Sequence, residues 1–140
     1  MKVRDAMAHT VSCAAPDDEV GTAAEMMRAE GAGFIPVVDA GRIVGVLTDR
    51  DIVVRGIAEA HGDPRDMRVG DLMTGEVTTI GPDQELEDAA RLMNEREVRR
   101  LPVVEGDGRL VGVLSHGNLV QATAGAGPGM AATIGVTRGA

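Results

Sequence analysis

The sequence is nearly free of aromatic side chains. Its 140 residues include one Phe, Phe34, and neither Trp nor Tyr. The hydrophobic share is 44%, within the range of globular proteins, so a core must be built from Val, Leu, Ile, Met and Ala. A flat ligand would therefore be held by aliphatic side chains and backbone, because aromatic stacking is almost excluded.

Cysteine is also scarce. Cys13 is the sole cysteine, which excludes an intramolecular disulfide and a cysteine-based zinc cage. We expect Cys13 to be a small buried hydrophobe on a strand. The three histidines, His9, His61 and His116, lack metal-ligand spacing, and His116 is interpreted as a surface or capping residue. No metal site is expected.

Basic charge and long apolar runs are missing as well. The net charge of −8 argues against a nucleic-acid partner, which would need a basic face. No run approaches the roughly 18 apolar residues of a membrane helix. The first 20 residues have no apolar segment typical of a signal peptide, so we expect a cytoplasmic protein with no membrane partner.

The chain repeats itself at an offset of 66 residues. This pairing aligns Met7 with Met73 and Pro16 with Pro82, and it places IPVV over LPVV and GVLT over GVLS. A tandem duplication follows. It predicts one repeat at 1–60, a polar linker at 61–68, a second repeat at 69–120 and a Gly/Ala-rich tail at 121–140. The tail is either mobile or docked over a partner or a cleft.

Each repeat is predicted to be an α/β unit of order β-α-β-β-α. Short strands at 10–14 and 77–80 run into Pro-Asp, which starts the helices expected at 18–30 and 84–97. The spacing i, i+3, i+4, i+7 of apolar residues supports both helices. The segments FIPVV with RIVGVLT, and RLPVV with RLVGVLS, are predicted β-hairpins. Helices at 49–60 and 117–123 are expected to close the repeats.

A threonine and an aspartate follow the first hairpin at a suggestive spacing. Thr48 ends the strand, and Asp51 falls in the first turn of the next helix. A carboxylate there can accept two ribose hydroxyls, and a helix N-terminus favours phosphate. The alternative is structural: Thr48 caps the helix and Asp51 supports its dipole.

These residues together resemble a known family. The order of strand, helix, Pro-Val-Val, Gly-Val-Leu-Thr and Asp, present twice in register over about residues 2–120, is similar to the CBS domain. Two such domains in tandem are called a Bateman module. TDRDIVVRG further resembles small stand-alone actinobacterial CBS-pair proteins. The resemblance implies a pseudo-twofold disc with two central sheets, two quasi-equivalent cleft sites for adenosine-bearing ligands, and no catalytic residues.

The resemblance also implies that each site combines the two repeats. Asp51 and Thr48 would then share a site with residues before and within the second hairpin. Arg99 and Arg100 stand where some family members bind phosphate, which suits the planar fork of arginine. The alternative is a solvated strand edge that pairs with Glu97 or Glu105. The predicted nucleotide site is Thr48, Arg50, Asp51, Val77, Thr78, Thr79, Val98, Arg99, Arg100 and Pro102.

Two members of this set keep a second interpretation. Arg50 reaches a β- or γ-phosphate or else pairs with Asp49 or Glu59. Arg99 and Arg100 are neighbours on a strand, so they point to opposite faces unless the strand start is bent.

The second site is predicted to be degenerate. Asn118 replaces Asp51 and loses the charge, Ser115 replaces Thr48, and Phe34 either fills the cleft or lies across an adenine. Neither a ribose carboxylate nor a phosphate arginine is present. The predicted degenerate site is Val11, Ser12, Gly33, Phe34, Pro36, Ser115 and Asn118.

The sequence therefore favours a non-catalytic regulatory module that binds an adenosine-containing nucleotide and signals to a partner protein. Candidate ligands are AMP, ADP or ATP, ahead of S-adenosylmethionine and NAD. The alternative is a ligand-free CBS dimerisation or interaction platform. No Walker loop, Ser-His-Asp set or spaced carboxylate pair indicates an enzyme. A homodimer through the CBS helices and an unidentified downstream protein are the expected protein partners.

Overall fold

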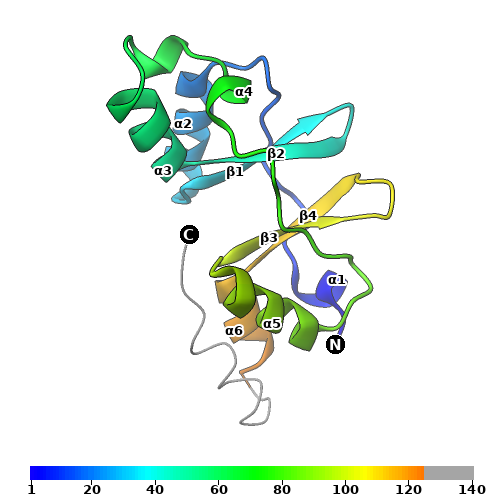
Figure 1. The fold of residues 1–140 in the computed structure, drawn as a ribbon. Helices are drawn as coiled ribbons and strands as arrows, with labels where there is room; N and C mark the ends of the chain where they lie inside the picture. The colour runs from blue at the N-terminus through cyan, green and yellow to red at the C-terminus, as the bar shows by residue number, and fades with distance from the viewer. Residues whose placement is uncertain (125–140) are drawn as a thin grey trace. The chain divides into compact units, whose positions relative to one another are not determined.

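A computed structural model of the chain describes residues 1–124, and these residues divide between two compact units. The N-repeat unit comprises Ser12–Val77. The C-repeat unit comprises Met1–Val11 together with the chain from Thr78 onward. Each unit is described by itself below (Figure 1).

The N-repeat unit is built on one helix and one hairpin. Helix α2 (Val20–Glu30) buries Val20, Ala23 and Met27 and ends at Gly31, whose φ of 66° is the left-handed conformation that terminates many helices. Strands β1 (Phe34–Asp39) and β2 (Arg42–Thr48) pair antiparallel. The chain continues into α3 (Asp49–Asp51), a π-helix η1 (Ile52–Ala58), the 3₁₀ turn η2 (Pro64–Asp66) and α4 (Val69–Leu72).

The C-repeat unit repeats this plan. Helix α5 (Leu86–Arg96) buries four apolar side chains and ends at Glu97, which has a φ of 55°. Strands β3 (Arg100–Val104) and β4 (Leu110–Ser115) pair antiparallel, and α6 (His116–Ala122) follows. Both hairpins have a register shift at the second Val of Pro-Val-Val. The expected mixed α/β class with two hairpins is confirmed.

The opening segment of each sequence repeat packs in the unit of the other repeat. Helix α1 (Val3–Ala6) belongs to the C-repeat unit, where the Val3 amide donates to the Gln84 carbonyl at 2.8 Å. Helix α4 belongs to the N-repeat unit, where the Val69 amide donates to the Asp18 carbonyl at 2.8 Å. In Figure 1 the blue α1 accordingly lies by α5 and α6, and the green α4 lies by α2. The compact units thus differ from the predicted repeats at 1–60 and 69–120 in their opening segments.

Two kinds of expected element differ from the structure. The strands expected at 10–14 and 77–80 each make a single backbone bridge, from Ala14 to Val37 and from Ile80 to Val103. The helix expected at 49–60 becomes a π-helix after Asp51. The expected linker contains the turn η2, and α6 extends to Ala122, into the expected tail. Residues 125–140 of that tail lie outside the described residues.

Each unit has its own aliphatic core, as the composition predicted. In the N-repeat unit Ile35, Val37 and Leu47 are fully buried against α2 and Val69. In the C-repeat unit the corresponding Leu101, Val103 and Leu114 are fully buried against α5 and Val3. Each core holds a helical methionine, Met27 or Met93.

Candidate functional site

The end of β2 presents Thr48 and Asp51 in a reciprocal arrangement. The Asp51 amide donates to Thr48 Oγ1 at 3.1 Å, and the Thr48 amide donates to Asp51 Oδ2 at 3.0 Å. This is a capping box, which satisfies two backbone donors at the start of α3. The capping role considered for these residues is therefore real, and it holds the carboxylate at the end of the strand.

The Asp51 side chain is buried, and a residue outside the capping box also contacts its carboxylate. Its exposed fraction is 9%, and it is the one buried charged residue within residues 1–124. Thr74 Oγ1 lies 3.2 Å from Oδ1 and 3.4 Å from Oδ2 of Asp51, so its hydroxyl donates to the carboxylate. A buried carboxylate needs such donors, because an unpaired charge is costly away from water.

Sequence reasoning missed Thr74. It directly follows Met73, which the repeat alignment did single out, and the same alignment pairs Thr74 with Ala8. A difference between repeats beside a matched residue was the available clue. The distance of 23 residues from Asp51 hid the contact.

The end of β4 has the same backbone and neutral side chains. The Asn118 amide donates to Ser115 Oγ at 3.0 Å, and the Ser115 amide donates to Asn118 Oδ1 at 3.0 Å. Ala8 pairs with Val113 as Thr74 pairs with Val46, so Ala8 occupies the position of Thr74 without a hydroxyl. The weaker ribose contact expected at Asn118 stays a prediction.

The residues around the two corners differ in charge. In the N-repeat unit the Asp49 amide donates to the Gly33 carbonyl at 3.1 Å, and the Asp49 carboxylate fills the space that a side chain at position 33 would need. In the C-repeat unit His116 and Arg99 take these places, and the His116 amide donates to the Arg99 carbonyl at 2.7 Å. The N-repeat corner therefore carries two carboxylates, on either side of Arg50 in the sequence, whereas the C-repeat corner has His116 and Asn118 in their places and carries Arg99 and Arg100.

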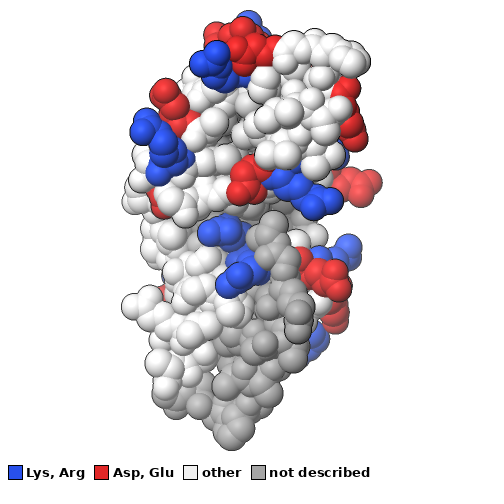
Figure 2. Space-filling model, turned by 90° about the vertical axis from the view of Figure 1, so that its left-hand side faces the viewer, with Lys and Arg blue, Asp and Glu red and all other residues white. Residues whose placement is uncertain are grey.

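The side chains of the three candidate phosphate-binding arginines form no ion pair within residues 1–124. Arg50 and Arg99 are exposed, and Arg100 is half-buried at the start of β3. Within residues 1–124 no ion pair joins them to Glu97, Glu105, Asp49 or Glu59. Figure 2 shows basic and acidic side chains interspersed on the face that it draws.

Backbone bonds join the segment that holds Thr78 and Thr79 to β3 at Ile80. The Ile80 amide donates to the Pro102 carbonyl at 3.1 Å, and the Val104 amide donates to the Ile80 carbonyl at 2.9 Å. Thr78 and Thr79 therefore directly precede a residue that is fixed to β3. In the N-repeat unit the Ala14 amide donates to the Pro36 carbonyl at 2.9 Å, which places Ser12 near β1 in the same way.

Each predicted site draws on both units. The N-repeat unit contains one group of the predicted residues: Ser12, Gly33, Phe34, Pro36, Thr48, Arg50, Asp51 and Val77. The C-repeat unit contains the other: Val11, Thr78, Thr79, Val98, Arg99, Arg100, Pro102, Ser115 and Asn118. Phe34 is half-buried opposite Thr48, and Arg100 lies opposite Ser115.

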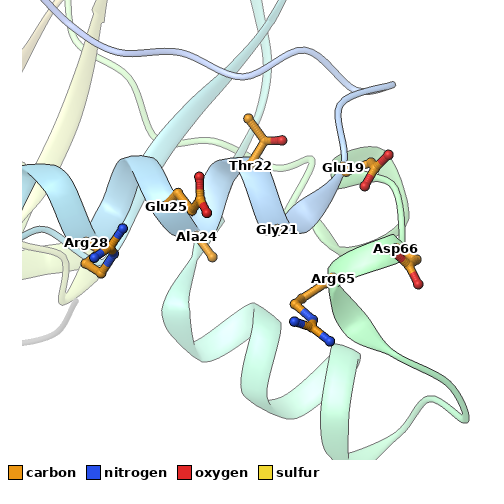
Figure 3. A pocket seen from close by; sticks show the side chains of 8 residues that line it. All are labelled: Glu19, Gly21, Thr22, Ala24, Glu25, Arg28, Arg65 and Asp66. Atoms are coloured by element: carbon orange, nitrogen blue, oxygen red, sulfur yellow. The ribbon is translucent and has the colours of Figure 1, made fainter.

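Two open hollows lie within single units. The first, about 500 Å³, lies between α2 and η2 in the N-repeat unit (Figure 3) and is lined by Glu19, Gly21, Thr22, Ala24, Glu25, Arg28, Arg65 and Asp66. None of these is a predicted site residue, and Arg65 is already paired with Asp63 at 2.8 Å. The second, about 520 Å³, lies in the C-repeat unit, and its lining includes Thr79 with Asp83 and Glu105. The lining of the first hollow thus offers Arg28 as its one basic side chain without an ion pair within residues 1–124, and the lining of the second has no Lys or Arg.

The remaining reactive groups do not form a site. Cys13, expected to be a small buried hydrophobe on a strand, is half-buried and lies outside the strands. Burial raises the pKa of its thiol, with a smaller contribution from Glu30. Within the part of the chain that the structure describes, no three His, Cys, Asp or Glu side chains are grouped to hold a metal ion. Across residues 1–124, helices are too short or too polar to span a membrane.

Comparison with known proteins finds one family throughout. The family model described as CBS domain matches residues 3–56 and 69–125. The chain is 38% identical over 117 residues to the CBS domain-containing protein YhcV of Bacillus subtilis, covering 84% of this chain and 81% of that protein. It is 33% identical over 119 residues to Hypoxic response protein 1 of Mycobacterium tuberculosis, covering 84% and 82%.

A solved structure adds a ligand to this comparison. The crystal structure of CBSX2 in complex with AMP superposes with a TM-score of 0.77 at 34% sequence identity. The match covers 89% of this chain and 96% of that one. The fold of a CBS domain pair therefore accounts for the duplication, the hairpins and the two strand-helix corners.

Proposed function

Because the chain belongs to the CBS-domain family, we propose that it is a non-catalytic regulatory module that binds an adenosine-containing nucleotide of the AMP, ADP or ATP type and signals to a partner protein. The observation that carries this proposal is the buried Asp51 carboxylate, held by Thr48 and Thr74 at the end of β2. The AMP complex of CBSX2 supports the choice of ligand class.

In the proposed site Asp51 accepts the ribose hydroxyls. An ionised carboxylate is acceptor-only and offers about four lone-pair positions, which suits a pair of neighbouring hydroxyls. Thr48 fixes the corner through its capping box. Asn118, which carries an amide in the same position of the C-repeat unit, offers one acceptor oxygen already used by the Ser115 amide.

Arg99 and Arg100 supply the phosphate contacts in the proposal. They have no ion-pair partner within residues 1–124, so a phosphate does not have to displace one. Charge-assisted hydrogen bonds contribute roughly 1.5–3 kcal/mol each. Without aromatic stacking, a micromolar dissociation constant, about −8 kcal/mol, is the expected affinity.

Signalling in this proposal follows from differential affinity. A ligand that binds one conformation of the module more tightly shifts its population toward that conformation. The downstream protein then distinguishes the two conformations.

A thermal-shift titration tests the proposal, reported by a dye because the chain has no Trp or Tyr. At ligand concentrations about 100 times the dissociation constant, linkage predicts roughly 2.7 kcal/mol of stabilisation. For a chain of this size that raises Tm by on the order of 10 °C. We expect AMP, ADP or ATP to give this shift, with S-adenosylmethionine and NAD as comparison ligands.

Two matched substitutions locate the site. Asp51→Asn keeps the shape and the cap but removes the charge, and it is expected to abolish the shift. Asn118→Ala, at the equivalent corner, is expected to leave it unchanged. Arg99→Ala and Arg100→Ala are expected to weaken AMP binding more than adenosine binding. A shift that survives Asp51→Asn would contradict the assigned site.

A second candidate function is a ligand-free dimerisation or interaction platform. The observation that favours it is the exposure of Val53 and Ile57, 55% and 61%, at i and i+4 on η1, and of Val120, 48%, on α6. Under this alternative, no nucleotide shifts Tm at millimolar concentration. Val53→Ser with Ile57→Ser would then reduce the sedimentation mass from dimer to monomer.

A further inference from the structure

Thr74 reaches Asp51 from a segment far from it in sequence, and that segment is anchored on both sides. The Thr74 amide donates to the Val46 carbonyl at 2.8 Å, and the Val46 amide donates to the Thr74 carbonyl at 2.9 Å. These two bonds fix the backbone of Thr74 against β2. Its hydroxyl is thereby aimed at both carboxylate oxygens of Asp51.

Arg55 holds the backbone of the two residues before Thr74. Its Nη1 donates to the Met73 carbonyl at 2.9 Å and to the Leu72 carbonyl at 3.2 Å. These carbonyls belong to the end of α4, where a cation is favoured by the helix dipole. Since η1 follows directly from Asp51, Arg55 ties the helix after the carboxylate to the segment that carries Thr74.

The C-repeat unit shows that the fold does not require these side chains. Ala8 and Val113 exchange the same two backbone bonds, at 2.9 and 3.1 Å, without a hydroxyl. The repeat alignment places Ala122 at the position of Arg55 and Asn118 at that of Asp51. The Thr74 hydroxyl and the Arg55 guanidinium therefore occur in the unit that has the carboxylate and not in the unit that lacks it, although both units have the same backbone bonds.

We propose that Thr74 is a positioning residue that orients the Asp51 carboxylate for two neighbouring ribose hydroxyls, with Arg55 holding Thr74 in place. This rests on the proposed nucleotide function. The Thr48 amide and the Thr74 hydroxyl occupy about two of the four lone-pair positions of Asp51. The remaining two are directed by these bonds, so both hydroxyls of a cis diol are accepted at once. A freely turning carboxylate would receive them less well.

The test compares a ribose with a deoxyribose ligand. Isothermal titration with AMP and 2′-deoxy-AMP is made on the full chain and on Thr74→Val, Thr74→Ser and Asp51→Asn. The unsubstituted chain is expected to prefer AMP by about tenfold or more, because 2′-deoxy-AMP leaves a carboxylate position unpaired. Thr74→Val is expected to weaken AMP binding about tenfold and to bring the two affinities close to each other.

The serine variant and a control separate positioning from stability. Thr74→Ser keeps the hydroxyl and is expected to restore both the AMP affinity and the preference over 2′-deoxy-AMP. Thr22→Val changes an exposed threonine on α2 and is expected to alter neither. Thermal unfolding by circular dichroism shows that each variant is folded at the titration temperature.

The outcomes distinguish this inference from the function on which it rests. If the unsubstituted chain binds AMP and Thr74→Val keeps both its affinity and its preference, the positioning role is wrong and the nucleotide function stands. If the unsubstituted chain binds no AMP at millimolar concentration, both are wrong. Loss of affinity in Thr74→Val with an unchanged preference would also overturn the positioning role.

Discussion

The two strand-helix corners share a backbone and differ in charge. Both have a capping box, a Pro-Val-Val hairpin and a short helix, with hydrogen bonds that agree within 0.1 Å at 3.0–3.1 Å. Around this shared frame the N-repeat unit carries Asp49, Arg50 and Asp51, whereas the C-repeat unit carries Arg99 and Arg100 and no carboxylate at the positions of Asp49 and Asp51. Divergence after duplication therefore changed the polar side chains at the corner and kept the bonds that form it.

In the proposed function, this difference gives each unit its own role. A buried carboxylate accepts hydroxyl groups, and unpaired arginines attract phosphate. A nucleotide contains both groups. The asymmetry is thus the reason to expect complementary roles for two units of common origin.

The largest expected effect tests whether the opening segments are exchanged between units. Leu47 and Leu114 are equivalent and fully buried, so Leu47→Ala and Leu114→Ala should each lower the free energy of unfolding by about 2–5 kcal/mol. Hydrogen exchange should show α1 losing protection with Leu114→Ala, and α4 losing it with Leu47→Ala. Loss of α1 protection in Leu47→Ala instead would break the division into units.

A second experiment tests a close backbone contact that occurs once within each unit. A Cβ on Gly45 would lie 2.8 Å from the Thr74 carbonyl oxygen, and one on Gly112 would lie 2.6 Å from that of Ala8. Gly45→Ala and Gly112→Ala should therefore destabilise to a similar extent, by about 1–3 kcal/mol in urea unfolding. Gly75→Ala and Gly106→Ala, which meet nothing within 4 Å, serve as controls. If Gly45→Ala and Gly112→Ala destabilise the protein no more than these controls do, the predicted close contact at the two glycines is wrong.

The smallest expected effect concerns the ends of the equivalent helices. Gly31 and Glu97 are both left-handed, at φ of 66° and 55°, a conformation that costs a residue with a Cβ about 1–2 kcal/mol. Glycine avoids this cost but loses more conformational entropy on folding. Glu97→Gly should therefore raise the free energy of unfolding by a smaller net amount, about 0.5–1 kcal/mol. Gly31→Ala should lower it by about 1 kcal/mol. Equal signs for the two substitutions would contradict this difference between the units.

Much of the local structure could be predicted from residue patterns. The helix expected at 18–30 is observed at Val20–Glu30, and the one expected at 84–97 at Leu86–Arg96. The hairpins follow from Pro-Val-Val and Gly-Val-Leu on either side of a turn. The capping role of Thr48 follows from its spacing to Asp51. These features depend on neighbours within four residues or across one turn.

The candidate site could be predicted only in part. Asp51 was identifiable because a carboxylate three residues after a strand-end threonine can accept ribose hydroxyls or support the start of the next helix. Thr74 was not, since nothing in the intervening 22 residues indicates that its segment returns to β2. The same holds for the extended segments before α2 and α5, whose pairing reduces to one bridge each.

The sequence by itself determined the duplication, the aliphatic cores, the helices and hairpins, and the opposite charges at the two corners, because these depend on composition and on short-range periodicity. Only the tertiary structure decided that α1 and α4 exchange units and that Thr74 and Arg55 converge near Asp51. The physical reason is that long-range backbone hydrogen bonds, such as Val3 to Gln84 and Val46 to Thr74, join segments whose residues carry no local mark of their partners.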